Sequence, residues 1–280
     1  MNVRMKTWTA MWLISMSIMA CNSTSSEKNK EGDTTAIQPK LKAETVSYKE
    51  DTTEAKGYVV YDENKAGKRP AILVVHEWWG INDYAKNRAR QLATMGYVAM
   101  AVDMYGNAKS GANPQEAQSL AMPFYIDPLL AKTRLEAALQ TLKLNPMVDS
   151  TKIAAIGYCF GGYVVLNAAK QGTQLNGVVS FHGNLIGAQP NKDLLKAKIL
   201  VCHGASDKFV NQAEVDAFKK GMDSIKADYT FIAYDSATHA FTNPMATEIG
   251  KKFELPIKYN EKADKKSWED MKVFFAKIFK

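Results

Sequence analysis

The chain alternates short, β-rich apolar runs with stretches in which apolar residues recur at helical spacing. The β-rich runs fall at residues 45–48, 57–61, 71–76, 97–103, 153–157, 178–182, 198–203 and 229–234. Helical periodicity falls at residues 83–95, 128–144, 161–171, 212–224 and 263–279. This alternation predicts a mostly parallel, eight-stranded sheet with helices on both faces. Because the first two runs have no helix between them, we expect an antiparallel hairpin or edge pair there.

The first 44 residues follow a different pattern. Arg4 and Lys6 precede an apolar run at residues 8–20, and Cys21 follows it directly. The run is shorter than the ~20 apolar residues of a bilayer-spanning helix, which is typical of a cleaved signal. Its ending resembles a bacterial lipoprotein signal, so we expect residues 1–20 to be a signal peptide and Cys21 to carry the lipid anchor. Ordinary secretion is the alternative.

Residues 21–44 contain few large apolar side chains, so we expect a flexible tether between the anchor and the folded part. The anchor would place the protein in the cell envelope, on the periplasmic or surface side, with the membrane as a partner. Residues 45–280 are long enough for one domain with a large core, and 46% of the whole chain is hydrophobic.

The net charge of +7 adds little to this picture. The lysines are interspersed with acidic residues, and no basic stripe with interleaved aromatic residues occurs along the chain. A solvated surface of mixed charge is therefore the better interpretation, and we expect no nucleic-acid partner.

A strand, a sharp turn and a helix are predicted around Cys159. The apolar run ends at Gly157, and Cys159 stands between Gly157 and Gly161 before a helical pattern. Glycines permit a strained turn and close backbone approach, so the motif predicts a nucleophile elbow with cysteine in place of serine. The following helix N-terminus favours a thiolate and a developing oxyanion. Taken alone, the motif leaves open a buried structural cysteine.

Two further residues, an aspartate and a histidine, follow Cys159 in the chain order of a catalytic triad. Asp207 follows the strand at 198–203, and His239 follows the strand at 229–234. The order nucleophile, acid, histidine, with each residue after a strand, is that of an α/β-hydrolase triad. Asp235 is a second candidate for the acid, although it lies on the same loop as His239, where a turn role is natural.

The remaining histidines and thiols have simpler interpretations. A metal site from His76, His182 and His203 is conceivable, but these residues lack ligand spacing, so we expect no metal and no cofactor. Cys202 lies in a strand that should be two places from the strand before Cys159, beyond disulfide reach. We therefore expect Cys202 to be a core residue and Cys159 to be a free thiol.

Residues 45–280 resemble the dienelactone hydrolase family of α/β-hydrolases. The resemblance rests on Gly157-Tyr-Cys159-Phe-Gly161-Gly162, Gly-Ala-Ser-Asp207, Thr-His239-Ala-Phe and Glu77 after the third strand. It implies that Cys159 attacks a cyclic or linear ester, that His239 is the base, and that Asp207 orients the imidazole. It also implies that Glu77 contacts the cysteine and helps to govern its activation. An ion pair of Glu77 with Arg88 or Arg90 is the alternative.

The expected site extends beyond these four side chains. The backbone N–H groups of Phe160 and Trp78 should form an oxyanion hole. If the loops fall as predicted, the substrate pocket is formed by Trp79, Tyr158, Phe181, His182, Phe241 and Asn243. These aromatic residues would favour an apolar acyl group, although aromatic residues at such positions also complete cores.

Asn243 stands where dienelactone hydrolases carry an arginine that holds the substrate carboxylate. Arg134 falls in a helical pattern typical of a solvated face, whereas Lys109 or Lys208 could act as point charges. We therefore expect a hydrolase of neutral small-molecule esters or lactones that works through a Cys-His-Asp triad and an acyl-enzyme. A non-catalytic lipid-anchored binding protein and a thioesterase or peptidase on this fold are the alternatives.

Overall fold

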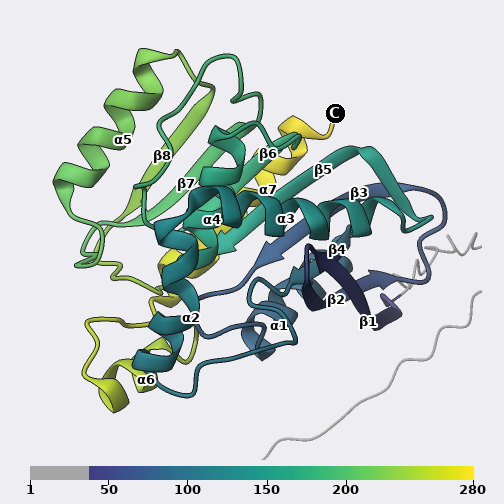
Figure 1. Ribbon diagram of the computed structural model, residues 1–280, viewed down its shortest axis with the longest axis horizontal. Coiled ribbons are helices and arrows are strands. Elements are labelled where there is room, and N and C mark those ends of the chain that lie inside the picture. The colour runs from purple at the N-terminus through teal and green to yellow at the C-terminus, as the bar shows by residue number, and fades with distance from the viewer. Residues whose placement is uncertain (1–37) are drawn as a thin grey trace, which may run out of the picture. The chain divides into compact units, whose positions relative to one another are not determined.

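The computed structural model describes residues 38–280, which form one eight-stranded sheet flanked by helices (Figure 1). The strands are β1 (Leu41–Glu50), β2 (Thr53–Asp62), β3 (Arg69–Val75), β4 (Val98–Val102), β5 (Val148–Tyr158), β6 (Gly177–Phe181), β7 (Lys198–Gly204) and β8 (Tyr229–Tyr234). The helices are α1 (Asp83–Thr94), α2 (Pro114–Ile126), α3 (Pro128–Lys143), α4 (Phe160–Lys170), α5 (Gln212–Ser224), α6 (Ala246–Phe253) and α7 (Glu261–Ile278). The predicted α/β-hydrolase architecture is confirmed.

The strand order across the sheet is β1-β2-β4-β3-β5-β6-β7-β8. β1 pairs antiparallel with β2, and β2 pairs antiparallel with β4, whereas every later pair is parallel. The predicted antiparallel pair at the edge is therefore confirmed. Because β3, β5, β6, β7 and β8 run in parallel, the loops that follow them meet at one edge of the sheet, where ligands bind in open α/β folds.

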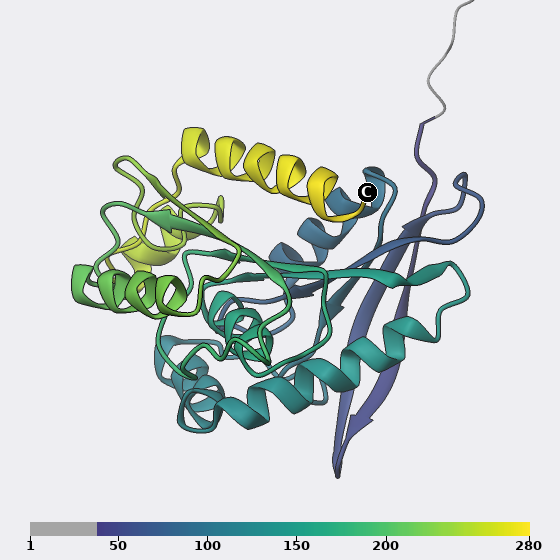
Figure 2. The same ribbon diagram turned by 90° about the horizontal axis from the view of Figure 1, so that it is seen from above.

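The sheet separates two apolar cores. Successive side chains of a strand point to opposite faces, so Leu73 joins the core with α3 and α4, whereas Ile72 joins the core with α1 and α7. Figure 2 shows α7 and α1 on one side of the sheet and α3 on the other. The strands are buried on both faces, which explains why their sequences are apolar runs without strict alternation.

The start of the folded part differs from the expectation. β1 begins at Leu41, and its first residues pair with the end of β2, Leu41 opposite Asp62. Residues 41–44 are therefore sheet and not tether. This edge strand is largely exposed, so its sequence is polar enough to resemble a linker. The predicted signal peptide and the Cys21 anchor lie outside the described residues. In residues 38–280, no helix is long and apolar enough to cross a membrane.

Two helices were not anticipated. α2 buries only three residues and contains Pro123, so its apolar pattern is weak, although Asn113 caps it and Pro114 begins it. α6 has eight residues and ends at Glu254 in the left-handed conformation. It is too short for a periodic pattern to be recognised. Both helices contribute to the wall of the pocket described below.

Candidate active site

The nucleophile elbow forms at the junction of β5 and α4. Cys159 has φ +52° and ψ −114°, a conformation that is rare for a residue with a side chain, and it is half-buried. A Cβ atom on Gly157 would lie 2.0 Å from the carbonyl oxygen of Gly161, and one on Gly161 would lie 2.3 Å from that of Val75. Only glycine fits at both positions, so the motif produces the sharp turn predicted for it.

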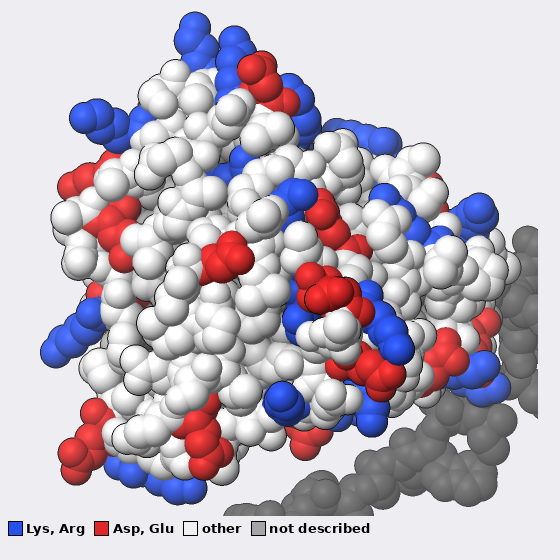
Figure 3. All heavy atoms as spheres, in the orientation of Figure 1, with Lys and Arg blue, Asp and Glu red and all other residues white. Residues whose placement is uncertain are grey.

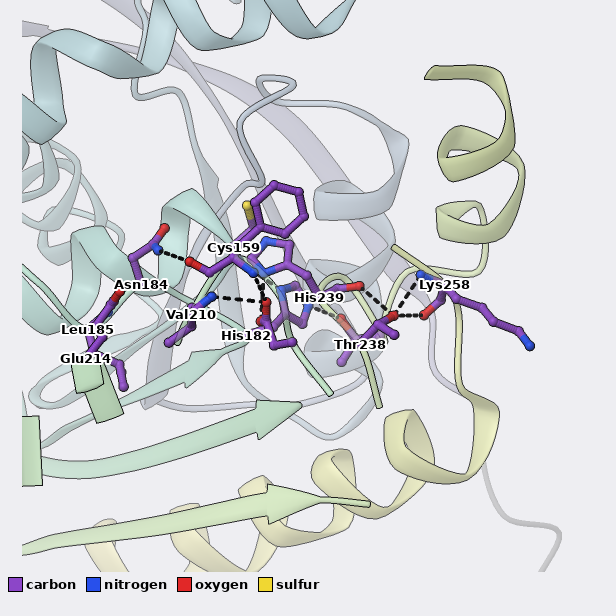
Figure 4. A network of polar contacts seen from close by, with 12 residues as sticks. Cys159, His182, Asn184, Leu185, Val210, Glu214, Thr238, His239 and Lys258 are labelled. Carbon is purple, nitrogen blue, oxygen red and sulfur yellow. Dashed lines mark hydrogen bonds and ion pairs between the residues drawn. The ribbon is translucent and has the colours of Figure 1, made fainter. Parts of the chain in front are cut away.

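Asp207 and His239 form the expected pair. His239 Nδ1 lies 2.9 Å from Asp207 Oδ2, and the Asp207 side chain is fully buried. Asp207 Oδ1 accepts hydrogen bonds from the backbone N–H groups of Phe209 (2.8 Å) and Val210 (3.3 Å), which fix the carboxylate. Asp235, the other candidate acid, is exposed. Figure 4 shows His239 and Cys159 close together in the same group of polar contacts.

The environment of His239 favours its charged form. Burial by itself would lower the pKa of His239, but the negative charge of Cys159 and hydrogen bonds with Asp207 and Cys159 raise this pKa well above the ordinary value. Since Nδ1 contacts Asp207, Nε2 is the ring nitrogen left to exchange a proton with Cys159. A histidine held in this way is suited to exchange a proton with a cysteine nucleophile.

Glu77 is held by Asn243. Asn243 Nδ2 donates a 2.6 Å hydrogen bond to Glu77 Oε2, and both residues are buried. Burial raises the pKa of Glu77 to about 7, against the lowering effects of Asn243, His239 and Arg88. In the described part of the chain, no hydrogen bond joins Glu77 to Cys159, although both line the same pocket, and the contact implied by the resemblance stays a prediction.

The alternative ion pairs for Glu77 are not formed. Arg88 Nη2 donates to Asp264 Oδ1 at 2.5 Å, and Arg90 Nη1 donates to Asn87 Oδ1 at 2.6 Å. Glu77 is therefore a buried carboxyl group whose only hydrogen bond within residues 38–280 comes from an amide. Its carboxyl group borders the same pocket as Cys159 and His239.

A pocket of about 210 Å³ lies over these groups. Of the expected pocket residues, Trp79 and Asn243 line it, together with Trp78 of the expected oxyanion hole. The expectation was wrong for Tyr158, Phe181, His182 and Phe241, which are buried in the molecule. Tyr158 and Phe181 stack on each other at 4.8 Å in the core beside α1 and α7. They sit on the strands rather than on the loops beyond them, so their rings complete the core.

Several residues of the pocket wall were not predicted from the sequence. The wall includes side chains from α2 and from the segment around α6: Gln118, Ala121, Met122, Tyr125, Ala246, Ile249, Leu255 and Ile257. Asn184 and Phe209 come from the loops after β6 and β7. Phe209 follows Asp207 closely enough for the sequence to have suggested it. The wall residues from α2 and from the segment around α6 depend on the two unanticipated helices and on a bridge that pairs His239 with Ile257.

The expected oxyanion-hole donors lie at the ends of two elements. Phe160 is the first residue of α4, where backbone N–H groups have no partner within the helix. Trp78 lies on the loop after β3, and its carbonyl oxygen accepts a 2.9 Å hydrogen bond from the Tyr105 hydroxyl. Within residues 38–280, neither backbone N–H donates a hydrogen bond. This leaves both donors available to a substrate.

Among residues 38–280, no lysine or arginine borders the pocket. Arg134 is buried and pairs with Glu50 at 3.0 Å, so it is not on a solvated face as its helical pattern suggested. On the molecular face seen in Figure 3, basic and acidic side chains are interspersed. The described residues contain no cluster of three or more histidine, cysteine or acidic side chains that could hold a metal ion.

The two thiols of the described part differ in accessibility. Both are free, and their strands are two places apart, as predicted. Cys202 is buried, and burial raises its pKa to about 12. The Tyr234 hydroxyl lies 3.5 Å from its sulfur, in the core beside α7. Cys159 alone borders the pocket.

Comparison with known proteins agrees with this geometry. Residues 55–279 match the model of the Dienelactone hydrolase family. An uncharacterized protein of Caenorhabditis elegans is 38% identical over 53% of this chain and 94% of its own length. A protein of Aquifex aeolicus that is named as a carboxymethylenebutenolidase is 27% identical over 84% of this chain and 98% of its own.

A solved structure extends the comparison to the fold. It is the crystal structure of a dienelactone hydrolase-like promiscuous phosphotriesterase from metagenomic libraries, with 34% identity and a TM-score of 0.80. The match covers 85% of this chain and 98% of that protein. The eight-stranded sheet, the elbow and the family match agree, and the chain belongs to the dienelactone hydrolase family of α/β-hydrolase enzymes.

Proposed function

We propose that this enzyme hydrolyses neutral carboxylic esters or lactones through a Cys159-His239-Asp207 triad. The observation that carries the proposal is the 2.9 Å contact of His239 with Asp207 on loops that bring the imidazole to Cys159. A binding protein would have no need for a buried carboxylate that orients a histidine beside the cysteine of an elbow.

The geometry supports a two-step reaction. The Cys159 thiolate attacks the ester carbonyl carbon, and the backbone N–H groups of Phe160 and Trp78 stabilise the oxyanion. The His239 imidazolium protonates the departing alcohol, which leaves an acyl-enzyme thioester. Neutral His239 then takes a proton from water, the resulting hydroxide attacks the thioester, and the acid product departs as the thiolate–imidazolium pair is restored.

The pocket supports an uncharged substrate with an apolar acyl group. Its wall is mainly aromatic and aliphatic, and its titratable residues are Glu77, Tyr125, Cys159 and His239. A substrate carboxylate would meet no lysine or arginine there. It would instead lie near Glu77, whose charge would repel it whenever that carboxyl group is ionised. We therefore expect this enzyme to share the reaction type of the carboxymethylenebutenolidases that it resembles, but to act on an uncharged substrate.

A neutral phosphotriester is a second candidate substrate. A similar enzyme, 34% identical, is described as a promiscuous phosphotriesterase. Phosphotriesters carry no charge, so the absence of lysine and arginine from the pocket wall suits them as well. The same thiolate would attack phosphorus and expel the alcohol, and the same backbone donors would face the phosphoryl oxygen.

The site of action is a separate proposal. We infer from the signal-like residues 1–20 and from Cys21 that the mature enzyme is lipid-anchored in the cell envelope.

A thioesterase or peptidase would use the same triad as an esterase. A panel of matched acetyl and butyryl esters, a thioester, a peptide and an aryl phosphotriester tests the assignment, with Cys159→Ala as the control. Highest kcat/KM on the neutral ester, lost in Cys159→Ala, is expected; turnover that survives this substitution would reject the triad.

A further inference from the structure

His182 lies behind the nucleophile, where it makes no contact with the pocket. It follows β6, is fully buried, and has φ +43°. Its Nδ1 accepts a 3.1 Å hydrogen bond from the backbone N–H of Cys159, which also donates to the carbonyl oxygen of Phe181 at 3.0 Å. The adjacent strands β5 and β6 are thus each followed by a residue with positive φ, and the side chain of His182 contacts the backbone of Cys159.

The other ring nitrogen of His182 reaches the catalytic histidine loop. Nε2 lies 2.7 Å from the Thr242 hydroxyl. Because Nδ1 accepts from Cys159, the proton of the neutral ring must be on Nε2, which therefore donates to Thr242. Burial, followed by the charges of His239 and Arg88, lowers the pKa of His182 well below its ordinary value. The ring therefore stays neutral, which this pair of hydrogen bonds requires.

Thr242 is itself held from the opposite side. Its hydroxyl lies 2.6 Å from that of Tyr84, and its carbonyl oxygen accepts a 2.7 Å hydrogen bond from Arg88 Nη2. Arg88 is anchored by Asp264 on α7. Thr242 is three residues after His239, so a fixed Thr242 also restrains the loop that carries the base.

We propose that His182 is a positioning residue that joins the Cys159 backbone to Thr242 and so fixes the nucleophile relative to His239. The proposal rests on the triad function proposed above. A positive φ in a residue with a side chain costs free energy, and such residues persist where the surrounding structure holds them. Here the unusual backbone of His182 allows its ring to reach Cys159, while the ring edge lies against His239 with centroids 5.3 Å apart.

The test compares substitutions that keep one hydrogen bond at a time. His182→Asn places an acceptor near the position of Nδ1, whereas His182→Gln places a polar group nearer to Nε2. We expect His182→Gln to lower kcat for a neutral ester by about tenfold or more with KM within about twofold, because misplaced reacting groups slow the chemical step. His182→Asn keeps the hydrogen bond from Cys159 and loses the one to Thr242, so its kcat should fall only several-fold, as in Thr242→Val. Iodoacetamide alkylation of Cys159 should slow in the same order.

Substitutions of Thr242 provide a second pair of variants. This pair is needed because glutamine suits the positive φ of residue 182 less well than asparagine, so His182→Gln could lose activity through its backbone alone. Thr242→Val removes the acceptor for Nε2 and keeps the shape, whereas Thr242→Ser keeps the hydroxyl. We expect a several-fold fall in kcat for Thr242→Val and little change for Thr242→Ser. Melting temperatures of all four variants identify any that fail to fold, and the Thr242 pair then decides the outcome.

Two results would overturn the inference. One is wild-type kcat in folded His182→Gln or Thr242→Val; the other is an equal loss in both members of a pair. Cys159→Ala separates this failure from that of the proposed function. If Cys159→Ala abolishes turnover while the His182 and Thr242 variants remain fully active, the triad stands and only the positioning role is rejected. If Cys159→Ala remains active, the triad and the positioning role both fail.

Discussion

Asn243 donates a 2.6 Å hydrogen bond to the Glu77 carboxyl group at the base of the pocket. The backbone N–H of Met245 donates to the Asn243 side-chain oxygen at 2.9 Å, so the amide is held at both ends. One of the two N–H donors of this amide is committed to Glu77, and the single uncharged donor that remains cannot form the paired clamp that an arginine forms on a carboxylate. At the position where dienelactone hydrolases carry an arginine, this enzyme thus has an asparagine that binds its own Glu77 and not the substrate.

This arrangement predicts a preference for uncharged substrates. A neutral ester and its carboxylated analogue of the same size should differ in kcat/KM by about tenfold or more in favour of the neutral member, because no lysine or arginine of residues 38–280 lines the pocket to offset the desolvation of the carboxylate. The measurement is the kcat/KM ratio at low and high salt. A carboxylated substrate that is favoured at low salt and loses its advantage at high salt would reveal a cation that acts on the site.

Glu77 should make the stability depend on pH. Its pKa is about 7 in the folded protein, above its ordinary value of 4.5, so the folded state retains a proton that the unfolded state releases. The free energy of unfolding should therefore fall as pH rises from about 4.5 to about 7, by on the order of 1–3 kcal/mol. Glu77→Gln should lack this loss. Urea denaturation at pH 4.5 and pH 8 compares the two proteins, and parallel changes would contradict the prediction.

The two thiols should respond differently to removal. Cys159→Ala should reduce kcat/KM for a neutral ester by at least about 10³-fold without loss of stability, since it removes the nucleophile. Cys202→Ala should retain activity and lose about 1 kcal/mol of stability, because it leaves a small cavity in the core. Turnover and thermal melts of both variants check this. An inactive but folded Cys202→Ala would mean that the wrong thiol has been assigned.

Asp207 and Asp235 offer a matched pair of acids near the same histidine. Asp207→Asn should lower kcat by about 10²–10⁴-fold, because an amide neither stabilises the imidazolium nor fixes its tautomer. Asp235→Asn should be close to wild type, since this side chain is exposed. Steady-state kinetics of both variants provide the measurement. Equal losses would show that Asp207 is not the orienting acid.

The N-terminal proposal has a direct test. Wild-type protein expressed with its first 20 residues in a bacterial host should partition into the detergent phase, and Cys21→Ser should move it to the aqueous phase. Mass spectrometry of the mature N-terminus identifies the acylated residue. A water-soluble wild-type protein that begins at another residue would reject the anchor.

The catalytic candidates could be predicted because their positions follow from backbone topology. Strands that alternate with helices bring their carboxyl ends to one edge, so the order of Cys159, Asp207 and His239 is enough to place them together. The glycines around Cys159 carry a local signal, since the elbow cannot form with larger residues. Both signals, the glycine pattern around Cys159 and the order of the strands, can be recognised in short stretches of sequence.

The pocket wall could not be predicted in the same way. Its residues come from α2 and α6, which have weak or very short apolar patterns, and their position depends on contacts with distant segments. Tyr158 and Phe181 were wrongly expected in the pocket, because a position at the end of a strand does not say which face of the sheet the side chain takes. The hydrogen bond of Asn243 with Glu77 could not be predicted either, since the sequence does not show which group a single amide side chain will bind.

The wall and the triad are built from different parts of the chain. α2 and the segment around α6 contribute much of the surface that a substrate would touch, whereas the reacting groups sit on loops fixed to β5, β7 and β8. Substitutions at Met122 or Ile249 therefore change the shape of the cavity without altering the elbow or the His239–Asp207 contact. Directed evolution confined to these two segments should redirect substrate choice while leaving the chemical machinery in place.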